Sequence, residues 1–278
     1  MPPGVPPTVV ESFAALIPAM FVMIFFFLIN LILGFLGTNA FQVVFDILQT
    51  PLVHLGGTLG ALLIAFLFNG LFWFFGINGG AVVGAVYGPV LATLSLENIE
   101  FFKNGVGSPN IVNEQFYELF VVYGGAGSTL SLIIAMLFFC KSKRITELGK
   151  LALIPGIFGI NEPIIFGLPM VLNPVMVLPF LLIPIFNILV GYTSMAMKLV
   201  PITNGVTIPW TTPPVISGFL ATDWRGAVLQ IILIIIGIFL YMPFIKAMDK
   251  QYLADEANAV EVASNDDLDL DSLSFDDL

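Results

Sequence analysis

The sequence has little of what disulfide scaffolds, metal sites and soluble surfaces require. Its 278 residues include one cysteine, Cys140, one histidine, His54, and only 10% charged residues. A single cysteine excludes a disulfide within the chain and any multi-cysteine metal site, and His54 has no second metal ligand nearby in the sequence. We therefore predict neither a metal nor a cofactor. Because soluble domains carry roughly 25% charged residues, a soluble enzyme is nearly excluded.

Basic residues are too few for nucleic-acid binding, and the C-terminal end has none. Nine of the 19 acidic residues lie in the last 28 residues, 251–278, which hold no Lys or Arg. The sequence pI of 4.3 therefore describes this tail, because acids and bases nearly balance in the rest of the chain. We predict a membrane-embedded domain over residues 1–250 and an acidic, disordered cytoplasmic tail over 251–278.

Long apolar runs make up most of the sequence. Hydrophobic residues account for 58%, and the mean hydropathy of +1.01 is typical of a membrane protein. A membrane-spanning helix needs about 20 apolar residues, and four runs qualify: 13–36, 55–77, 119–140 and 226–245. The glycines in Gly124-Gly-Ala-Gly127 fall inside the third run, where we expect them to allow close helix packing. The fold class predicted is an all-α polytopic membrane protein.

Three other apolar regions are too rich in proline, glycine or polar residues for straight membrane helices. Residues 151–197 span 47 residues with six prolines, and predict a broken or re-entrant hairpin followed by one or two spans. Residues 76–89 are glycine-rich, and residues 203–214 are polar and proline-rich. Non-helical backbone at membrane depth survives only when it is buried in protein or lines a wet cavity, so these breaks indicate a functional cavity.

The distribution of charge between loops predicts the orientation. Basic residues follow the third apolar run, at Lys141, Lys143, Arg144 and Lys150. This loop should therefore face the cytoplasm, whereas the acidic loop 97–118 should lie outside. Lys246 and Lys250 place the C-terminus in the cytoplasm.

Glu162 is the strongest candidate functional residue, because it is the only charge in the region 151–197. An ionisable group at membrane depth is costly and by default marks a substrate or ion path. The alternative is a carboxyl group held neutral for structural reasons. Asn161 and Glu162 together suit sugar hydroxyls as well as a cation, and the sequence leaves both ligands open.

Two of the three tryptophans lie beside the predicted breaks. Trp73 precedes the glycine-rich region and Trp210 lies in the proline-rich one, so each ring could stack on a sugar or mark the lipid headgroup belt. Trp224 is interpreted as a belt residue. We interpret His54 as a helix-end residue and Cys140 as a small apolar residue at the end of a span.

One stretch of sequence is long and specific enough to indicate a family. It reads Gly159-Ile-Asn-Glu-Pro-Ile-Ile-Phe-Gly-Leu-Pro169. Further matching segments are Pro3–Pro7, Ser12–Pro18, Phe72–Ile77, Gly124–Thr129 and Pro209–Gly218. These segments resemble the membrane IIC component of the lactose/cellobiose/chitobiose family of sugar phosphotransferase systems, and the resemblance extends from Pro3 to about Lys250.

The resemblance implies a homodimeric transporter whose sugar-binding domain contains two re-entrant hairpins. It implies uptake of a β-linked disaccharide, such as cellobiose, chitobiose or lactose, which is phosphorylated at the inner face of the bacterial cytoplasmic membrane. The donor is a phosphocysteine on a separate IIB protein, so enzymatic activity of this chain alone stays open. By position, Glu162 would hydrogen-bond the reacting hydroxyl and accept its proton. Asn161, Trp73, Trp210 and Gly4 would contact the sugar.

The chain departs from the family pattern in two places. Relatives typically have His where this chain has Asn78, which forms hydrogen bonds but does not titrate near neutral pH. We predict that Asn78 binds the sugar and positions it. Relatives also carry several membrane segments before the Pro3–Pro7 motif, so this sequence is expected to be the C-terminal portion of the family fold. It could be a truncated product, a chain with a misplaced start, or half of a split transporter.

Two alternatives to a sugar phosphotransferase subunit stay open. One is a membrane remnant without transport activity, or a scaffold that recruits partners through its acidic tail. The other is an ion-coupled secondary transporter, since such proteins also place broken helices near the middle of the membrane.

Overall fold

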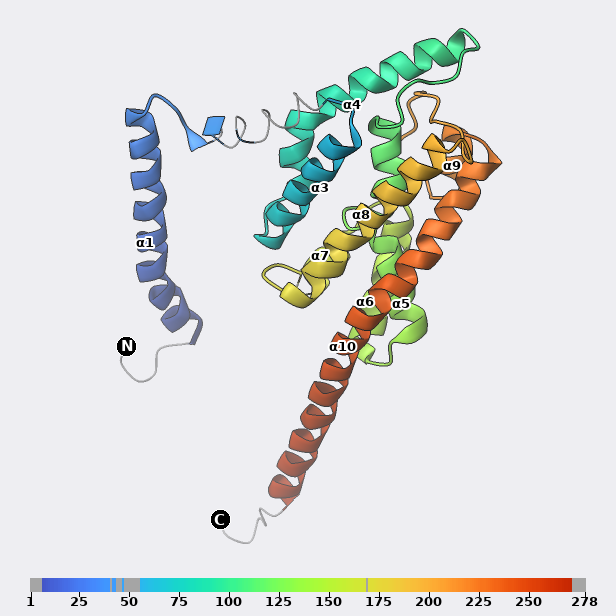
Figure 1. Ribbon diagram of the computed structural model, residues 1–278. Helices are drawn as coiled ribbons and strands as arrows, with labels where there is room; N and C mark the ends of the chain where they lie inside the picture. The colour runs from blue at the N-terminus through green and yellow to red at the C-terminus, as the bar shows by residue number, and fades with distance from the viewer. Residues whose placement is uncertain (1–6, 41, 44–46, 48–55, 169, 272–278) are drawn as a thin grey trace. The chain divides into compact units, whose positions relative to one another are not determined.

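The computed structural model describes residues 7–40, 42–43, 47, 56–168 and 170–271, and every regular element among them is a helix (Figure 1). Side chains are described from residue 14 to residue 258, apart from these gaps. The chain divides into two compact units, 1–50 and 51–278, and each is considered on its own.

The first unit contains helix α1, Pro7–Phe35. Its segment Ala14–Phe35 is 22 residues long, is apolar on all sides and has no buried side chain. A helix that is apolar all round needs lipid or protein around it, and its length is sufficient to cross a membrane. The span predicted at 13–36 is therefore confirmed as a helix of spanning length.

The second unit is a bundle of helices of unequal length. The elements are α3 Leu59–Phe74, α4 Gly79–Lys103, the π-helix η1 Phe116–Val121, α5 Thr129–Phe139, α6 Lys143–Ile157, α7 Glu162–Gly167, α8 Pro174–Ala196, α9 Ile216–Ala221 and α10 Trp224–Asp271. In the described part of this unit, α4, α8 and the segment Trp224–Asn258 of α10 are long and apolar enough to span a membrane. Helix α10 packs against α5, α8 and α9, and α3 packs against α4 and α8 (Figure 1).

The predicted span 119–140 is wrong, because η1 and α5 are separated by a turn at 122–128. Gly124, Gly125 and Gly127 have φ angles of +72°, +97° and +80°, in the left-handed region that glycine adopts without penalty. The backbone therefore leaves the helical path here. These glycines form a turn rather than the helix-packing surface that we expected.

The glycine-rich region 76–89 is also less broken than predicted. Only Gly76 has a positive φ, +78°, and α4 runs without interruption from Gly79. A Cβ atom on Gly79 would collide with the backbone oxygen of Asn69, so glycine at this position lets α4 approach α3 closely. Helix α3 has 16 residues, short of the predicted span 55–77.

The other two predicted breaks are confirmed. Region 151–197 divides into the end of α6, the short helix α7 and the long helix α8, and residues 201–209 have no regular structure. Asn161 follows α6 and donates a hydrogen bond to the Ala126 carbonyl oxygen at 2.8 Å. Helix α6 therefore returns to the level of the turn 122–128 before α7 begins.

Long side chains from neighbouring helices hold the turn 122–128 in place. The Tyr241 hydroxyl of α10 donates to the Gly127 carbonyl oxygen at 2.6 Å, and the Asn187 amide of α8 donates to the Ser128 hydroxyl at 2.9 Å. The amide of Gln230 donates to the Leu119 carbonyl oxygen at 2.7 Å. Broken backbone in an apolar bundle needs such internal partners, because lipid provides none.

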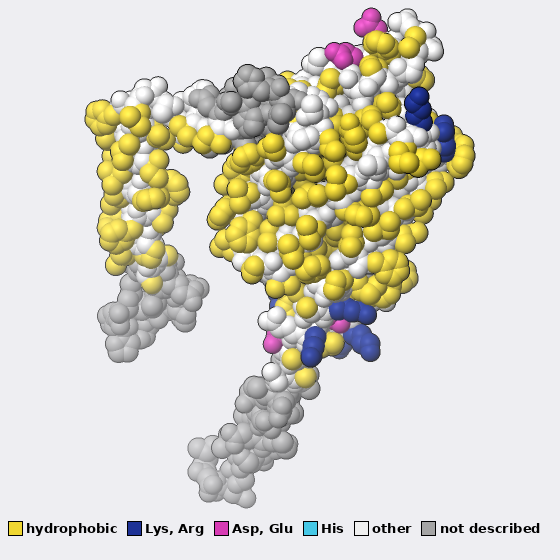
Figure 2. Space-filling model, viewed as in Figure 1, with side chains coloured by type: hydrophobic (Ala, Val, Ile, Leu, Met, Phe, Trp, Pro, Cys, Tyr) yellow, Lys and Arg dark blue, Asp and Glu magenta, His cyan; other side chains and the backbone are white. Residues whose placement is uncertain are grey.

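The loop between α5 and α6 is bound by carboxylates of α10. Asp249 accepts from the backbone N–H groups of Lys141 and Ser142, and Glu256 accepts from the Ser142 hydroxyl at 2.7 Å. Tyr252 is buried beside them. For the rest of 251–278, disorder stays a prediction. Figure 2 shows Lys and Arg side chains around the end of the unit from which α10 emerges.

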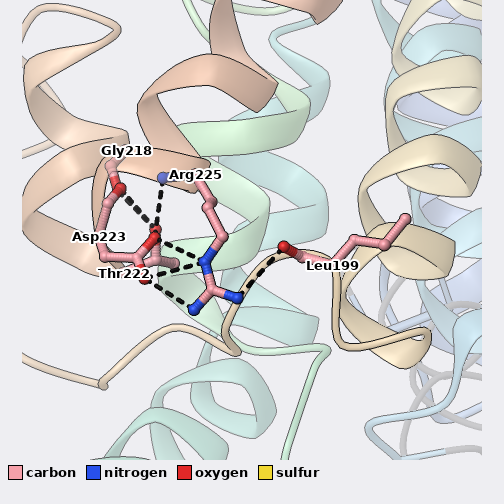
Figure 3. Close-up of polar contacts among 5 residues, drawn as sticks. All are labelled: Leu199, Gly218, Thr222, Asp223 and Arg225. Atoms are coloured by element: carbon pink, nitrogen blue, oxygen red, sulfur yellow. Dashed lines mark hydrogen bonds and ion pairs between the residues drawn. The ribbon is translucent and has the colours of Figure 1, made fainter.

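The other end of α10 begins in a polar cluster (Figure 3). The Arg225 guanidinium group donates to Asp223 at 2.8 Å, and more weakly to the Leu199 carbonyl oxygen at 3.5 Å, just after α8. The hydrogen bond from Arg225 lowers the pKa of the Asp223 carboxyl group below its usual value. The Thr222 hydroxyl donates to the Gly218 carbonyl oxygen at 2.8 Å, which joins α9 to the start of α10.

Candidate functional site

A cavity of about 1160 Å³ lies within the second unit. It is lined by parts of α3, α4, η1, the turn 122–128, the start of α7 and the loop that carries Trp210. Five residues singled out in the sequence line it together: Trp73, Asn78, Asn161, Glu162 and Trp210. The sixth, Gly4, lies outside the described residues, as does His54. Cys140 ends α5 and is buried away from the cavity lining.

Asn161 and Glu162 occupy the bend between α6 and α7. Gly159, with φ +84°, turns the chain here, and Asn161 is only 6% exposed. Its amide group lies against Gly125, where a Cβ atom would come within 2.5 Å of the Asn161 Cγ atom. Glu162 is the first residue of α7, and its exposed carboxylate has no hydrogen-bond partner among the described residues. This carboxylate is therefore available to a ligand.

The two tryptophans reach the cavity in different ways. Trp210 is 55% exposed and covers the bend. A Cβ atom placed on Gly159 would lie 3.1 Å from the Trp210 ring. Trp73 is half-buried and meets Phe180 edge-on, with 6.5 Å between the ring centroids. The indole N–H of Trp73 has no hydrogen-bond partner in the described part of the chain. Aromatic rings beside a few polar groups are the usual composition of a small-molecule site.

Asn78 is the N-cap residue of α4. Its side-chain oxygen accepts a hydrogen bond from the Ala81 N–H at 3.0 Å, which satisfies one of the free donors at the start of the helix. The amide NH₂ group of Asn78 is exposed and has no partner among the described residues. Asn78 therefore has a structural role through its oxygen and a donor group left for a ligand.

A polar group on the cavity wall formed by α3 and η1 was not predicted from the sequence. Asn69 is 2% exposed, and its amide nitrogen lies 3.2 Å from the Tyr117 hydroxyl, while its oxygen has no partner in the described chain. Glu118 is half-buried beside them and also lines the cavity.

Glu118 was assigned to an outer acidic loop because three other glutamates precede it between residues 97 and 117. One signal separates it from them: Glu118 directly precedes the apolar run Leu119-Phe-Val-Val122. It also lies in a π-helix, an element often found at functional sites. The described residues contain no cluster of three or more His, Cys, Asp or Glu side chains placed to hold a metal ion.

The fold and the cavity define a class of protein: a multi-pass membrane protein with broken helices around a large cavity of mixed polarity. The sequence profile of the family described as "Phosphotransferase system, EIIC" matches residues 1–184. The chain belongs to this family, within the group that includes lactose-, cellobiose- and chitobiose-specific components. The resemblance stated from the motifs is therefore confirmed.

Several curated relatives are similar over most of this chain. The oligo-beta-mannoside-specific EIIC component of Bacillus subtilis (strain 168) is 44% identical, over 92% of this chain and 59% of the relative. The cellobiose-specific EIIC component of Geobacillus stearothermophilus is 42% identical, over 92% and 58%. The chain thus spans about 59% of the length of such relatives.

A solved structure matches the fold. It is the crystal structure of the transporter ChbC, the IIC component from the N,N'-diacetylchitobiose-specific phosphotransferase system. The TM-score is 0.72 at 38% sequence identity, with 92% of this chain and 60% of that chain covered. The all-helical membrane fold predicted from the sequence is confirmed at this level.

Proposed function

We propose that this chain is part of a phosphotransferase-system sugar permease that moves a β-linked disaccharide of the cellobiose, chitobiose or lactose type across the membrane. The observation that carries the proposal is the shared cavity of about 1160 Å³, in which Glu162, Asn161 and Asn78 lie with two tryptophans. This volume is slightly above the roughly 300–1,000 Å³ of small-molecule sites, which suits a sugar larger than one ring.

Glu162 is the proposed catalytic residue. Its carboxylate accepts the proton of the sugar hydroxyl while the hydroxyl oxygen attacks the phosphorus atom of the IIB phosphocysteine. The sulfur–phosphorus bond breaks, and the cysteine leaves as a thiolate. Asn161 is fixed by its hydrogen bond to Ala126, so it holds one wall of the cavity in place, and the exposed amide NH₂ group of Asn78 donates to the sugar. Trp73 and Trp210 provide apolar faces for the sugar rings.

The proposed arrangement in the membrane has two re-entrant hairpins. One consists of α6 and α7, which return to the level of the turn 122–128, and the other of residues 201–221, which fold back before α10. The basic residues around the α5–α6 loop support a cytoplasmic position for this loop and for the acidic C-terminal segment. Phosphorylated IIB would then approach from this side. Gly4 near the sugar, and a homodimer formed by a chain of the relatives' full length, stay predictions.

The function is tested by following labelled cellobiose in the cells that naturally produce this protein. Uptake should need the IIB protein, and the intracellular sugar should be phosphorylated. Deletion of the gene for IIB is the control. Uptake of unmodified sugar that is driven by an ion gradient and does not need IIB would favour a secondary transporter. No uptake of cellobiose, lactose or chitobiose would favour a scaffold.

Asn78 gives a separate prediction about positioning. Asn78→Asp keeps an oxygen that caps α4 but loses the amide donor, so we expect the KM for sugar to rise about tenfold with little loss of protein. Asn78→His should raise kcat no more than a few-fold. Transport assays on membranes with equal protein content measure both. If the native chain shows only background turnover and Asn78→His restores transport, the proton shuttle instead requires an imidazole.

A further inference from the structure

The cavity contains negative groups that the proposed reaction does not use. Besides Glu162, the side chains of Glu114 and Glu118 line it, and no Lys, Arg or His is found among its described lining residues. Like Glu162, Glu118 has no hydrogen-bond partner for its carboxyl group in the described part of the chain. An unpaired carboxyl group in such a place is costly unless a ligand provides donors.

Polar groups beside Glu118 also point to a ligand. The side chain of Asn69 is 2% exposed and lines the cavity, and its oxygen has no partner among the described residues. Its amide nitrogen lies 3.2 Å from the hydroxyl of Tyr117, the residue before Glu118. This wall offers mostly hydrogen-bond acceptors, which suit the hydroxyl groups of a neutral sugar.

A sugar phosphate differs from its parent sugar by a group with nearly two negative charges. Carboxylates repel that group, and the repulsion is strong where the dielectric constant is low and no cation compensates. We propose that Glu118 is a specificity-determining residue that makes the cavity bind neutral disaccharide and reject the phosphorylated product. This inference rests on the proposed function. It also favours net inward movement of sugar, because phosphorylated product that has left the cavity does not compete with incoming sugar.

The test compares the affinities of cellobiose and cellobiose 6′-phosphate for the protein purified from the cells that naturally produce it. Binding is measured at pH 8, well above the ordinary pKa of a glutamate side chain. We expect the native protein to bind the phosphate at least about tenfold more weakly than the sugar. In Glu118→Gln this ratio should fall at least about threefold, mainly through tighter binding of the phosphate.

Two variants separate this effect from general damage. Glu118→Asp keeps the charge and should keep the native ratio. Glu100→Gln makes the same chemical change on an exposed part of α4 outside the cavity lining and should leave both affinities unchanged. Raising the salt concentration should reduce the native ratio only slightly, because buried charges are poorly screened.

The outcomes distinguish this inference from the proposed function. Binding of cellobiose with an unchanged ratio in Glu118→Gln overturns the role of Glu118 and leaves the sugar site standing. Equal affinity of the native protein for cellobiose and cellobiose 6′-phosphate also overturns the role of Glu118 and leaves the sugar site standing. If native protein binds neither cellobiose nor the other two disaccharides, the proposed function fails and the inference fails with it. If Glu118→Gln does not fold, Glu118→Ser, which also removes the charge, takes its place, and an unchanged ratio in that variant overturns the role of Glu118.

Discussion

Glu162→Gln is expected to lower the rate of sugar phosphorylation and uptake by about a hundredfold or more, since general-base catalysis contributes roughly 10²–10⁴-fold. Glutamine has nearly the same shape as glutamate and still forms hydrogen bonds, but it does not accept the proton of the reacting hydroxyl. Sugar affinity should change much less than turnover. The amount of protein inserted in the membrane should stay the same, because the Glu162 carboxylate contacts no described protein partner that would be lost.

The matched control is Glu147→Gln on α6, the neighbouring helix of the same hairpin. Glu147 is exposed, and its only described ion pair is with Lys150 at 2.7 Å, an exposed pair that contributes little to stability. This variant should transport at the native rate. Membranes with equal protein content, measured with labelled cellobiose and IIB, provide the comparison. A loss of inserted protein in Glu162→Gln would support the structural role that the sequence left open, and undiminished turnover would rule out the catalytic one.

The sequence revealed those site residues whose chemistry conflicts with their surroundings. Glu162 is the only charge in 47 otherwise uncharged residues, so its importance follows from the cost of placing it there. Trp73 and Trp210 were recognised because each lies beside a break in an apolar run. In all three cases a local pattern pointed to a residue, and the structure places the three on one cavity.

Other features depended on tertiary contacts that local patterns do not contain. Gly79 and Gly125 both lie in glycine-rich apolar sequence, yet Gly79 begins a long helix and Gly125 lies in a turn. The difference comes from their neighbours: α3 packs closely on Gly79, whereas α8 and α10 provide hydrogen bonds to the turn. Glu118 was missed for the opposite reason, since it follows an acidic loop and so resembles a surface residue.

Gly125→Ala is expected to disrupt the site from a position on the cavity wall where only backbone is present. Gly125 has φ +97°, where an L-amino acid costs roughly 1–2 kcal/mol. The new Cβ atom would also lie 2.5 Å from the Asn161 Cγ atom and 2.8 Å from its amide nitrogen. Asn161 must therefore move, and its hydrogen bond to Ala126 weakens. Because Glu162 follows it directly, turnover should fall on the order of a hundredfold, as for a displacement of about 1 Å.

The variant Gly105→Ala separates the effect of backbone strain from the effect of moving Asn161. Gly105 has a similar left-handed φ, +71°, but no atom lies within 4 Å of the position that a Cβ atom would occupy. It should share the backbone penalty and show a smaller drop in thermal stability than Gly125→Ala, with transport unchanged. Equal loss of transport in both variants would mean that strain alone inactivates the protein. A second substitution, Asn161→Gly, removes the Cβ, Cγ and amide nitrogen atoms that the new Cβ atom would meet, so it should relieve the collision in Gly125→Ala and recover part of its stability. If stability recovers but turnover does not, Asn161 matters for transport because it positions Glu162, and not because it helps the turn to fold.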